Sequence, residues 1–210
     1  MIFYPLTKTD ETYVFPQQIT AVGNYVFYGC EYLTRIDIPQ GVREIGDFAF
    51  SNCKNLKEVH LSEEVSGIGN NAFYQCKNLR QVTLRGVRSI GDWAFGDCIG
   101  LSDIVLPDGL KKIGNWAFFN CRKLTRLRLP NSIQEIGNNA FYGCSPYLKM
   151  MVAPDSYAKK YCLEKQLPCY DEDLSEQGTP VPEMDAFERL KQQLMRSGTP
   201  EAPSSTPSPT

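Results

Sequence analysis

The chain has 210 residues, enough for one domain with a tail, and its hydrophobic fraction of 42% is ordinary for a globular protein. A formal net charge of −2 and a pI near 5.5 argue against nucleic acid or an anionic membrane as a partner, because both would favour a basic stripe on the surface. No apolar run is long enough to cross a bilayer, and residues 1–10 lack the charged and apolar regions of a signal peptide. We therefore expect neither membrane insertion nor an export signal in this sequence.

Residues 1–18 come before the first regular pattern. They contain an apolar run at residues 2–4 and a polar turn at residues 8–12, and we expect one or two short strands here. Two interpretations of the segment remain open. It is either a natural N-terminal cap or the truncated end of a repeat that continues upstream in a longer protein.

Residues 19–154 repeat one pattern six times. Each copy opens with a Gly followed by Asn or Asp, and the glycines lie 23, 23, 22, 23 and 23 residues apart. A Phe follows four residues after each Gly, and a Cys follows three residues after each Phe. These columns consist of Gly23, Gly46, Gly69, Gly91, Gly114 and Gly137, of Phe27, Phe50, Phe73, Phe95, Phe118 and Phe141, and of Cys30, Cys53, Cys76, Cys98, Cys121 and Cys144. Such a period predicts a solenoid in which neighbouring copies complete one another's core.

The second half of each copy has the pattern Leu-x-x-[Ile/Val/Leu]-x-[Ile/Leu], which is typical of the strand of a leucine-rich repeat. The sixth copy is imperfect, and we align it as Leu148, Met151 and Ala153, with one extra residue after Cys144. We expect the strands to form one parallel sheet whose side chains point alternately inward and outward.

With Ala-Phe-x-x-Cys before the strand in most copies and Pro after it in four, the unit resembles the BspA-type, or Treponema-type, bacterial leucine-rich repeat over roughly residues 13–170. The resemblance implies an α/β solenoid: a right-handed horseshoe or arc with a parallel sheet, about six 23-residue repeats and a C-terminal capping helix. It implies little about function, because one fold serves many functions.

Each column has a physical role in this interpretation. The Gly is expected to supply a turn with positive φ, and the Asn or Asp after it is expected to N-cap one or two helical turns. On such a turn the residue before Phe, the Phe and the Cys share one buried face. We predict that the six cysteines of the column are buried free thiols, since parallel side chains do not readily offer the torsion of a disulfide.

The period stops after Pro154. Residues 155–170 are expected to form an amphipathic helix, with Asp155 or Ser156 as its N-cap, that covers the open edge of the last repeat. A linker, a second amphipathic helix and a disordered tail are then expected at residues 171–181, 182–197 and 198–210.

The sequence offers no arrangement of catalytic or metal-binding residues. It contains no Cys-x-x-Cys motif, and its one histidine, His60, is at an outward strand position, away from the inward cysteines. A nucleophilic cysteine therefore lacks a base, and the glycines do not form a phosphate-binding loop. Cys162 and Cys169 lie outside the repeated column, and whether they pair in an oxidising compartment is left open. We predict no enzymatic activity, no cofactor and no metal.

The first candidate for binding a partner is the concave strand face that the resemblance implies. Its outward residues are Arg35 and Asp37, Glu58 and His60, Gln81 and Thr83, Asp103 and Val105, Arg126 and Arg128, Met150 and Val152. We expect Arg126 and Arg128 to be its anchors, since Arg is enriched among binding hot spots. The alternative is a mixed-charge surface without a ligand.

The second candidate is an aromatic ridge on the opposite side of the solenoid, formed by Tyr25, Phe48, Trp93 and Trp116. If these side chains are exposed together, they mark a contact site. The alternative is that they stack on one another between neighbouring turns and are mostly buried.

The resulting prediction is a non-enzymatic module that binds a protein partner. The resemblance implies a bacterial surface protein that attaches to host matrix proteins or to other cells. The alternative is a cytoplasmic or structural scaffold in which the solenoid presents the helix of residues 182–197. Localisation and oligomeric state stay open at this stage.

Overall fold

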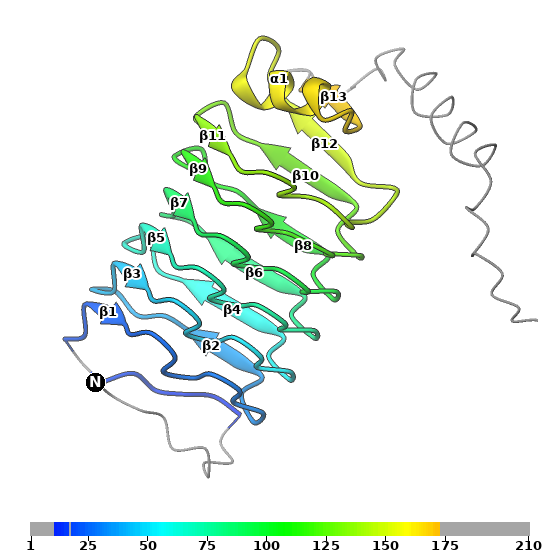
Figure 1. Ribbon diagram of the computed structural model, residues 1–210. Coiled ribbons are helices and arrows are strands. Elements are labelled where there is room, and N and C mark those ends of the chain that lie inside the picture. Colours follow the sequence, from blue (N-terminus) through cyan, green and yellow to red (C-terminus); the bar gives the residue numbers. More distant parts are fainter. Residues whose placement is uncertain (1–10, 17, 173–210) are drawn as a thin grey trace, which may run out of the picture. The chain divides into compact units, whose positions relative to one another are not determined.

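The computed structural model describes residues 11–16 and 18–172 (Figure 1). The expectations for residues 1–10, for the second helix at residues 182–197 and for the tail at residues 198–210 lie outside the described residues, as does the linker from residue 173 onward. All structural statements below concern the described part of the chain.

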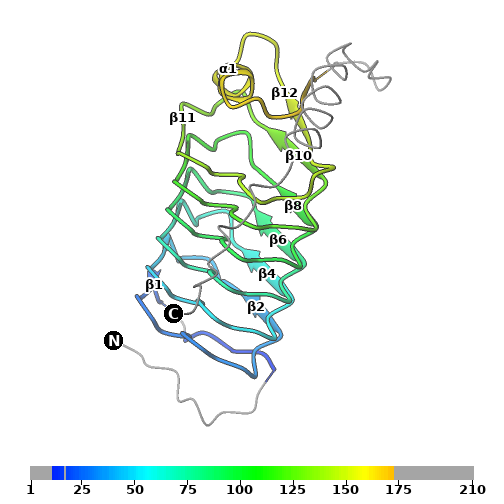
Figure 2. The ribbon, with the colours of Figure 1, turned by 45° about the vertical axis from the view of Figure 1, so that its right-hand side comes forward.

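Parallel strands of three or four residues, one from each copy, stack along one side of the solenoid (Figure 2). They are β2 (Arg35–Asp37), β4 (Glu58–Leu61), β6 (Gln81–Leu84), β8 (Asp103–Val105), β10 (Arg126–Leu129) and β12 (Lys149–Val152). The expected parallel pairing is confirmed. The expectation of one continuous sheet is wrong, because β2, β4, β6 and β8 form one sheet while β10 and β12 pair with a further strand, β13 (Cys169–Asp171).

A separate sheet of two-residue strands runs along the solenoid. It pairs, in order, β1 (Ala21–Val22), β3 (Glu44–Ile45), β5 (Gly67–Ile68), β7 (Ser89–Ile90), β9 (Lys112–Ile113) and β11 (Glu135–Ile136). The sequence pattern did not predict this sheet. Two residues are too short to display the alternation by which a strand is recognised, and the backbone bonds that define these strands run between copies.

Two consecutive tight turns stand where helical turns are expected in each copy. In the second copy, Ala49 N–H donates to Gly46 O at 3.3 Å, and Cys53 N–H donates to Phe50 O at 3.3 Å. The third residue of each turn has a positive φ, 56° at Phe48 and 62° at Asn52. A right-handed helix does not accommodate two such residues, so the predicted helical turns are wrong.

From Gly46 onward, the column glycines are required by a close approach between copies. The positive φ falls two residues after each Gly, so the expected role of Gly is wrong. A Cβ at Gly46 would lie 2.5 Å from Asn24 Oδ1 and 2.7 Å from Asn24 N in the preceding copy. Because backbone atoms cannot move aside as a side chain can, only Gly permits this spacing.

The Asn or Asp after each Gly links the copies. Its Oδ1 accepts a hydrogen bond from the backbone N–H of its counterpart in the next copy, at 2.7–2.8 Å, along the series Asn24, Asp47, Asn70, Asp92, Asn115 and Asn138. The predicted N-cap role is therefore wrong. The Asn and Asp column forms a ladder along the solenoid, and the two carboxylates in it are separated by an Asn.

The ladder should contribute measurably to stability. Asp92→Ala removes the acceptor of Asn115 N–H, at 2.7 Å, and of Asn115 Nδ2, at 3.2 Å. We expect a loss of about 1–3 kcal/mol in the free energy of unfolding, measured by urea titration. Asp92→Asn keeps an acceptor at the same position and should cost clearly less. Equal losses in both variants would contradict a role for the acceptor.

The core consists of stacked columns, as expected. The rings of Phe27, Phe50, Phe73, Phe95, Phe118 and Phe141 stack nearly parallel, with centroids 4.9–5.6 Å apart. From Cys53 onward, each column thiol donates to the carbonyl oxygen of the Phe in the preceding copy, at 3.0–3.3 Å. The buried Leu, Ile and Val side chains of the strands complete this core.

Both ends of the Phe column are covered. At the N-terminal end, the rings of Tyr13 and Phe15 contact Phe27, with centroids 4.9 and 5.8 Å away. At the C-terminal end lies the expected capping helix, α1 (Tyr157–Glu164), with Ser156 as its N-cap. Its Tyr161 ring contacts Phe141 edge-on, and the Tyr161 hydroxyl donates to Gly137 O at 3.1 Å.

The segment after α1 differs from the expectation. The helix ends at Glu164 and the chain returns as β13, parallel to β12, so that Asp171 belongs to a strand and not to a linker. No repeat pattern marks these residues in the sequence, and the strand is fixed by pairing with β12.

The alignment of the sixth copy also needs correction. The register pairs Leu127 with Met150 and Leu129 with Val152, and both Met150 and Val152 are buried. Lys149 and Met151 therefore point outward, where the prediction places Met150 and Val152. Met150 follows Cys144 by six residues, as Leu127 follows its Cys, so the copy contains no extra residue before the strand.

Candidate functional site

The outward side chains of the long strands form a continuous surface, which we call the strand face. One column of it holds Arg35, Glu58, Gln81, Asp103, Arg126 and Lys149, and the other holds Asp37, His60, Thr83, Val105, Arg128, Met151 and Tyr170. Of the twelve residues predicted for this face, ten lie on it and are exposed or half-buried, whereas Met150 and Val152 are buried. The core residues between them point inward, as the alternation requires.

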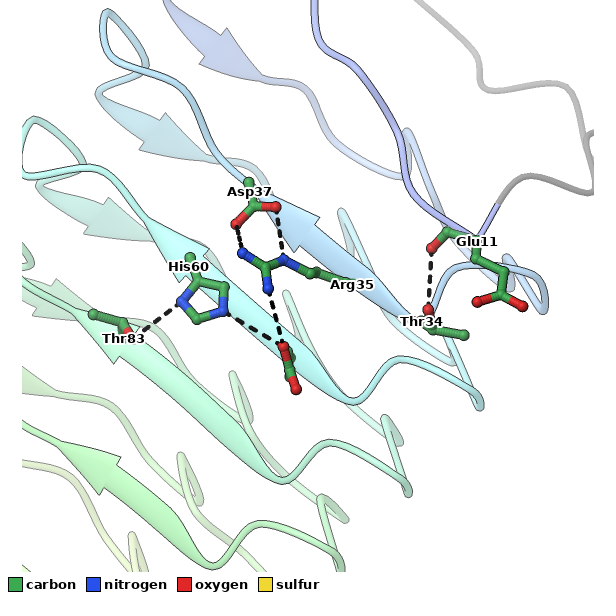
Figure 3. A network of polar contacts seen from close by, with 7 residues as sticks. Glu11, Thr34, Arg35, Asp37, His60 and Thr83 are labelled. Carbon is green, nitrogen blue, oxygen red and sulfur yellow. Dashed lines mark hydrogen bonds and ion pairs between the residues drawn. The ribbon is translucent and has the colours of Figure 1, made fainter.

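The N-terminal part of the strand face is a network of paired charges (Figure 3). The guanidinium of Arg35 donates to both oxygens of Asp37, at 2.8 and 2.9 Å, and to Glu58 Oε2 at 3.4 Å. The hydrogen bonding of Asp37 to Arg35 lowers the pKa of the Asp37 carboxyl. His60 lies between Glu58, at 3.7 Å, and Thr83, at 3.4 Å. Because these side chains already form hydrogen bonds and ion pairs with one another, a protein that bound here would have to break those bonds.

A shallow groove of about 380 Å³ adjoins this network. Its polar lining includes Asp37, Gln40, Glu63 and Arg85, and Arg85 pairs with Glu63 at 3.5 Å. The mixed charges give the groove no strong preference for an anion or a cation. His60 and Ser62 also line the groove, and their Nε2 and Oγ atoms are buried without a hydrogen bond among the described residues.

The C-terminal part of the strand face has a different chemistry. The Val105 side chain is 71% exposed, and Met151 is half-buried two strands further along the same column, with Arg128 between them. Lys149 Nζ lies 5.9 Å from the centre of the Tyr170 ring. Arg126 is exposed and makes no ion pair or side-chain hydrogen bond within residues 11–16 and 18–172. We call Val105, Arg126, Lys149, Met151 and Tyr170 the C-terminal patch.

The two predicted arginine anchors are in different situations. Arg128 donates to the carboxylates of Asp108 and Glu172, and these bonds raise the pKa of its guanidinium. It thereby ties β10 to the loop after β8 and to the residue that follows β13. Arg126, two residues earlier on β10, has no such partner in the described chain and keeps its donors available.

Three members of the C-terminal patch were missed by the sequence interpretation. Lys149 and Met151 were hidden by the incorrect alignment of the sixth copy, which counting six residues from Cys144 would have avoided. No sequence signal indicates Tyr170, because β13 lies outside the repeats and is placed by pairing with β12.

The predicted aromatic ridge is divided into two clusters. Tyr25 and Phe48 stack with centroids 4.8 Å apart, and Trp93 and Trp116 stack at 5.3 Å, but Asn71 separates the pairs. The tryptophan pair also contacts Phe119 edge-on. Tyr25 is 50% exposed, whereas the other three are half-buried. These contacts favour stacking between turns as the explanation for most of the ridge.

The residues that could carry catalysis lie apart. His60 is on the strand face, while the column cysteines lie behind it, all of them buried except the half-buried Cys144. Within the described ranges, no group of three or more His, Cys, Asp or Glu side chains could hold a metal ion. Nor does that part of the chain contain a helix with the length and apolarity needed to span a membrane.

The repeat geometry has a counterpart among known families. The family model described as the BspA type leucine-rich repeat region matches residues 2–101 and 84–167, in six copies. The chain belongs to this family. Leucine-rich repeat proteins of this kind are generally non-enzymatic scaffolds that mediate protein interactions. A search of curated proteins finds no match.

Solved structures of bacterial leucine-rich repeat proteins are similar to this BspA-type chain. A leucine-rich repeat protein of Treponema pallidum is 28% identical, with a TM-score of 0.66, over 91% of this chain and 86% of that one. A leucine-rich repeat protein of Eubacterium ventriosum is 30% identical, with a TM-score of 0.61, over 68% of this chain and 45% of that one. A leucine-rich cell surface protein of Faecalibacterium prausnitzii is 28% identical, with a TM-score of 0.52, over 74% of this chain and 48% of that one. The chain thus spans about half the length of the last two.

Proposed function

We propose that this BspA-type chain is a non-enzymatic protein-binding module and that its C-terminal patch contacts the partner. The observation that carries the proposal is the contrast between the two parts of the strand face. Arg35 is held by two carboxylates, whereas Arg126 has no partner within the described ranges and lies on the same face as exposed Val105.

The chemistry of the patch supports protein recognition. Arg and Tyr are enriched among the residues that dominate binding energy, and Met151 and Val105 add apolar area beside them. Because hydrogen-bonded strands hold these side chains, a partner would bind with little ordering cost on this side. The patch carries the cations Arg126 and Lys149, so a partner with acidic residues around an apolar centre fits it best.

The setting we propose is the bacterial cell surface, with attachment to host matrix proteins or to other cells. One similar structure is described as a leucine-rich cell surface protein. The alternative, a cytoplasmic scaffold that presents the helix of residues 182–197, depends on residues that lie outside the described part of the chain. A binding assay with and without residues 173–210 separates the two, because only the scaffold requires that segment.

Binding should depend on Arg126 and Tyr170 but not on Arg35. We expect Arg126→Ala and Tyr170→Ala each to weaken binding to a partner recovered from a panel of matrix proteins by about 10- to 100-fold, or 1–3 kcal/mol, in biolayer interferometry. Arg35→Ala is the matched control and should change the affinity less than threefold, since its guanidinium is already engaged. Arg128→Ala is a poorer probe because it also breaks bonds to Asp108 and Glu172.

Two results would contradict the assignment of the patch. One is unchanged binding by the Arg126 and Tyr170 variants. The other is loss of binding when Trp93 and Trp116 are replaced by Ala in a protein that keeps its circular dichroism spectrum. The second result would place the contact on the aromatic ridge.

A further inference from the structure

Three sulfur-containing side chains lie close together in the C-terminal cap. Cys162 of α1 places its Sγ 3.7 Å from Met150 Sδ of β12. Met150 in turn pairs with Cys169 across β12 and β13. Burial raises the pKa of the Cys162 thiol, and the nearby Cys169 thiol raises it further. The two cysteines are 0% and 7% exposed, so the cluster is part of the interior.

This pair differs from neighbouring thiols of the repeated column. Column cysteines occupy equivalent positions of stacked copies, so their side chains run parallel, and from Cys53 onward each thiol is also engaged by a Phe carbonyl. Cys162 and Cys169 belong to a helix and to a strand that pack against each other, with six residues between them. Their side chains therefore approach from different elements. A disulfide needs a Cβ–S–S–Cβ torsion near 90°, which parallel side chains do not readily offer.

We propose that Cys162 and Cys169 are a disulfide-forming pair that locks the C-terminal cap when the protein folds in an oxidising environment. The oxidant is a small-molecule disulfide. The thiolate of Cys169 attacks it, forms a mixed disulfide and releases one small thiol. The thiolate of Cys162 then attacks Cys169 Sγ, so that the protein disulfide forms and the second small thiol leaves. The protons lost by the two cysteines are taken up, through solvent, by the two small thiolates that leave, and two electrons go to the small disulfide.

Folding is the stage at which the exchange takes place. Burial raises the pKa of the Cys162 thiol to about 12, so the folded protein holds little of the reactive thiolate. Before α1 packs on β13, both thiols are accessible. Once formed, the bond joins α1 to the last described strand. Tyr161, beside Cys162, covers the end of the Phe column, so the crosslink holds the cover in place.

The experiment refolds the full chain in a mixture of oxidised and reduced glutathione, alkylates the remaining thiols under denaturing conditions and maps the peptides by mass spectrometry. We expect six alkylated cysteines and one peptide pair linked through Cys162 and Cys169. Cys169→Ala and Cys162→Ala should each abolish the linked pair. Cys76→Ala, in the column, should leave it intact. Eight alkylated cysteines, or a link within the column, would overturn the pairing.

A thermal melt tests the lock itself. The oxidised protein should melt about 5 °C higher than the same protein after reduction with dithiothreitol, because closing the loop restricts the unfolded chain. Cys169→Ala should show no difference between the two conditions. A linked peptide without any shift in melting temperature would show that the bond forms but does not lock the cap.

Discussion

Gly69→Ala is expected to cost about 3–5 kcal/mol of stability and to leave much of the protein unfolded. The added Cβ would lie 2.6 Å from Asp47 Oδ1 and 2.7 Å from both Asp47 N and Gly46 C. Two of these atoms belong to the backbone of the preceding copy, so the contact is relieved only by moving two copies apart. In a solenoid each copy contacts only its neighbours, and a break at this central position therefore removes an interface that no other contact replaces.

Gly109→Ala is the matched control. A Cβ at Gly109 would meet no atom within 4 Å, and its backbone is not in the left-handed region. We expect its free energy of unfolding, measured by urea titration, to stay within about 0.5 kcal/mol of that of the parent protein. If both substitutions cost the same, the close approach of the copies is not the reason for the glycine column.

A second large effect is expected from alkaline pH. Burial raises the pKa of the thiols of Cys30, Cys76, Cys98, Cys121 and Cys162. For Cys53, a hydrogen bond with Cys76 and then burial raise the thiol pKa. The folded state therefore binds these protons more tightly than the unfolded chain does. The stability linked to them is fully present below the unfolded pKa, about 8.5, and is lost as pH rises through the folded pKa.

The expected loss is steep because the thiols act together. Above pH 8.5 each contributes up to about 1.4 kcal/mol of destabilisation per pH unit. We expect the free energy of unfolding, measured in urea under reducing conditions, to fall by several kcal/mol between pH 8.5 and about 9.5, below the ordinary tyrosine pKa of about 10. Cys98→Ala should have a shallower slope by about 1.4 kcal/mol per unit. A stability that stays constant over this range would refute the linkage.

The core and its period could be predicted because each depends on residue type at a fixed spacing. Phe50, Cys53 and Val59 recur in kind every 22 or 23 residues, and all are buried in the structure. The roles of Gly46 and Asp47 could not be predicted in the same way. Local preference favoured a positive φ and an N-cap, whereas both residues are selected by contacts with the neighbouring copies, 23 residues away.

The candidate site shows the same division. Alternation along a strand placed Arg35, Arg126 and Arg128 outward, as found. It did not reveal that, among the described residues, Arg35 and Arg128 are engaged by carboxylates while Arg126 is not. Asp37 is on the same strand as Arg35, but Glu58, Asp108 and Glu172 come from other strands and loops. Tyr170 joined the face only through the pairing of β13 with β12.

By itself, then, the sequence determined that this is a BspA-type solenoid with buried Phe and Cys columns and a helical cap, because every repeat must bury the same residues against its neighbours. Only the tertiary structure decided the phase of β12, the strand after α1, which arginine of the strand face has no carboxylate partner among the described residues, and the proximity of Cys162 to Cys169. Those features arise where the repeat ends or where side chains of different copies meet. At these places packing across the fold decides which side chains contact one another, and the residues nearby in sequence do not specify those contacts.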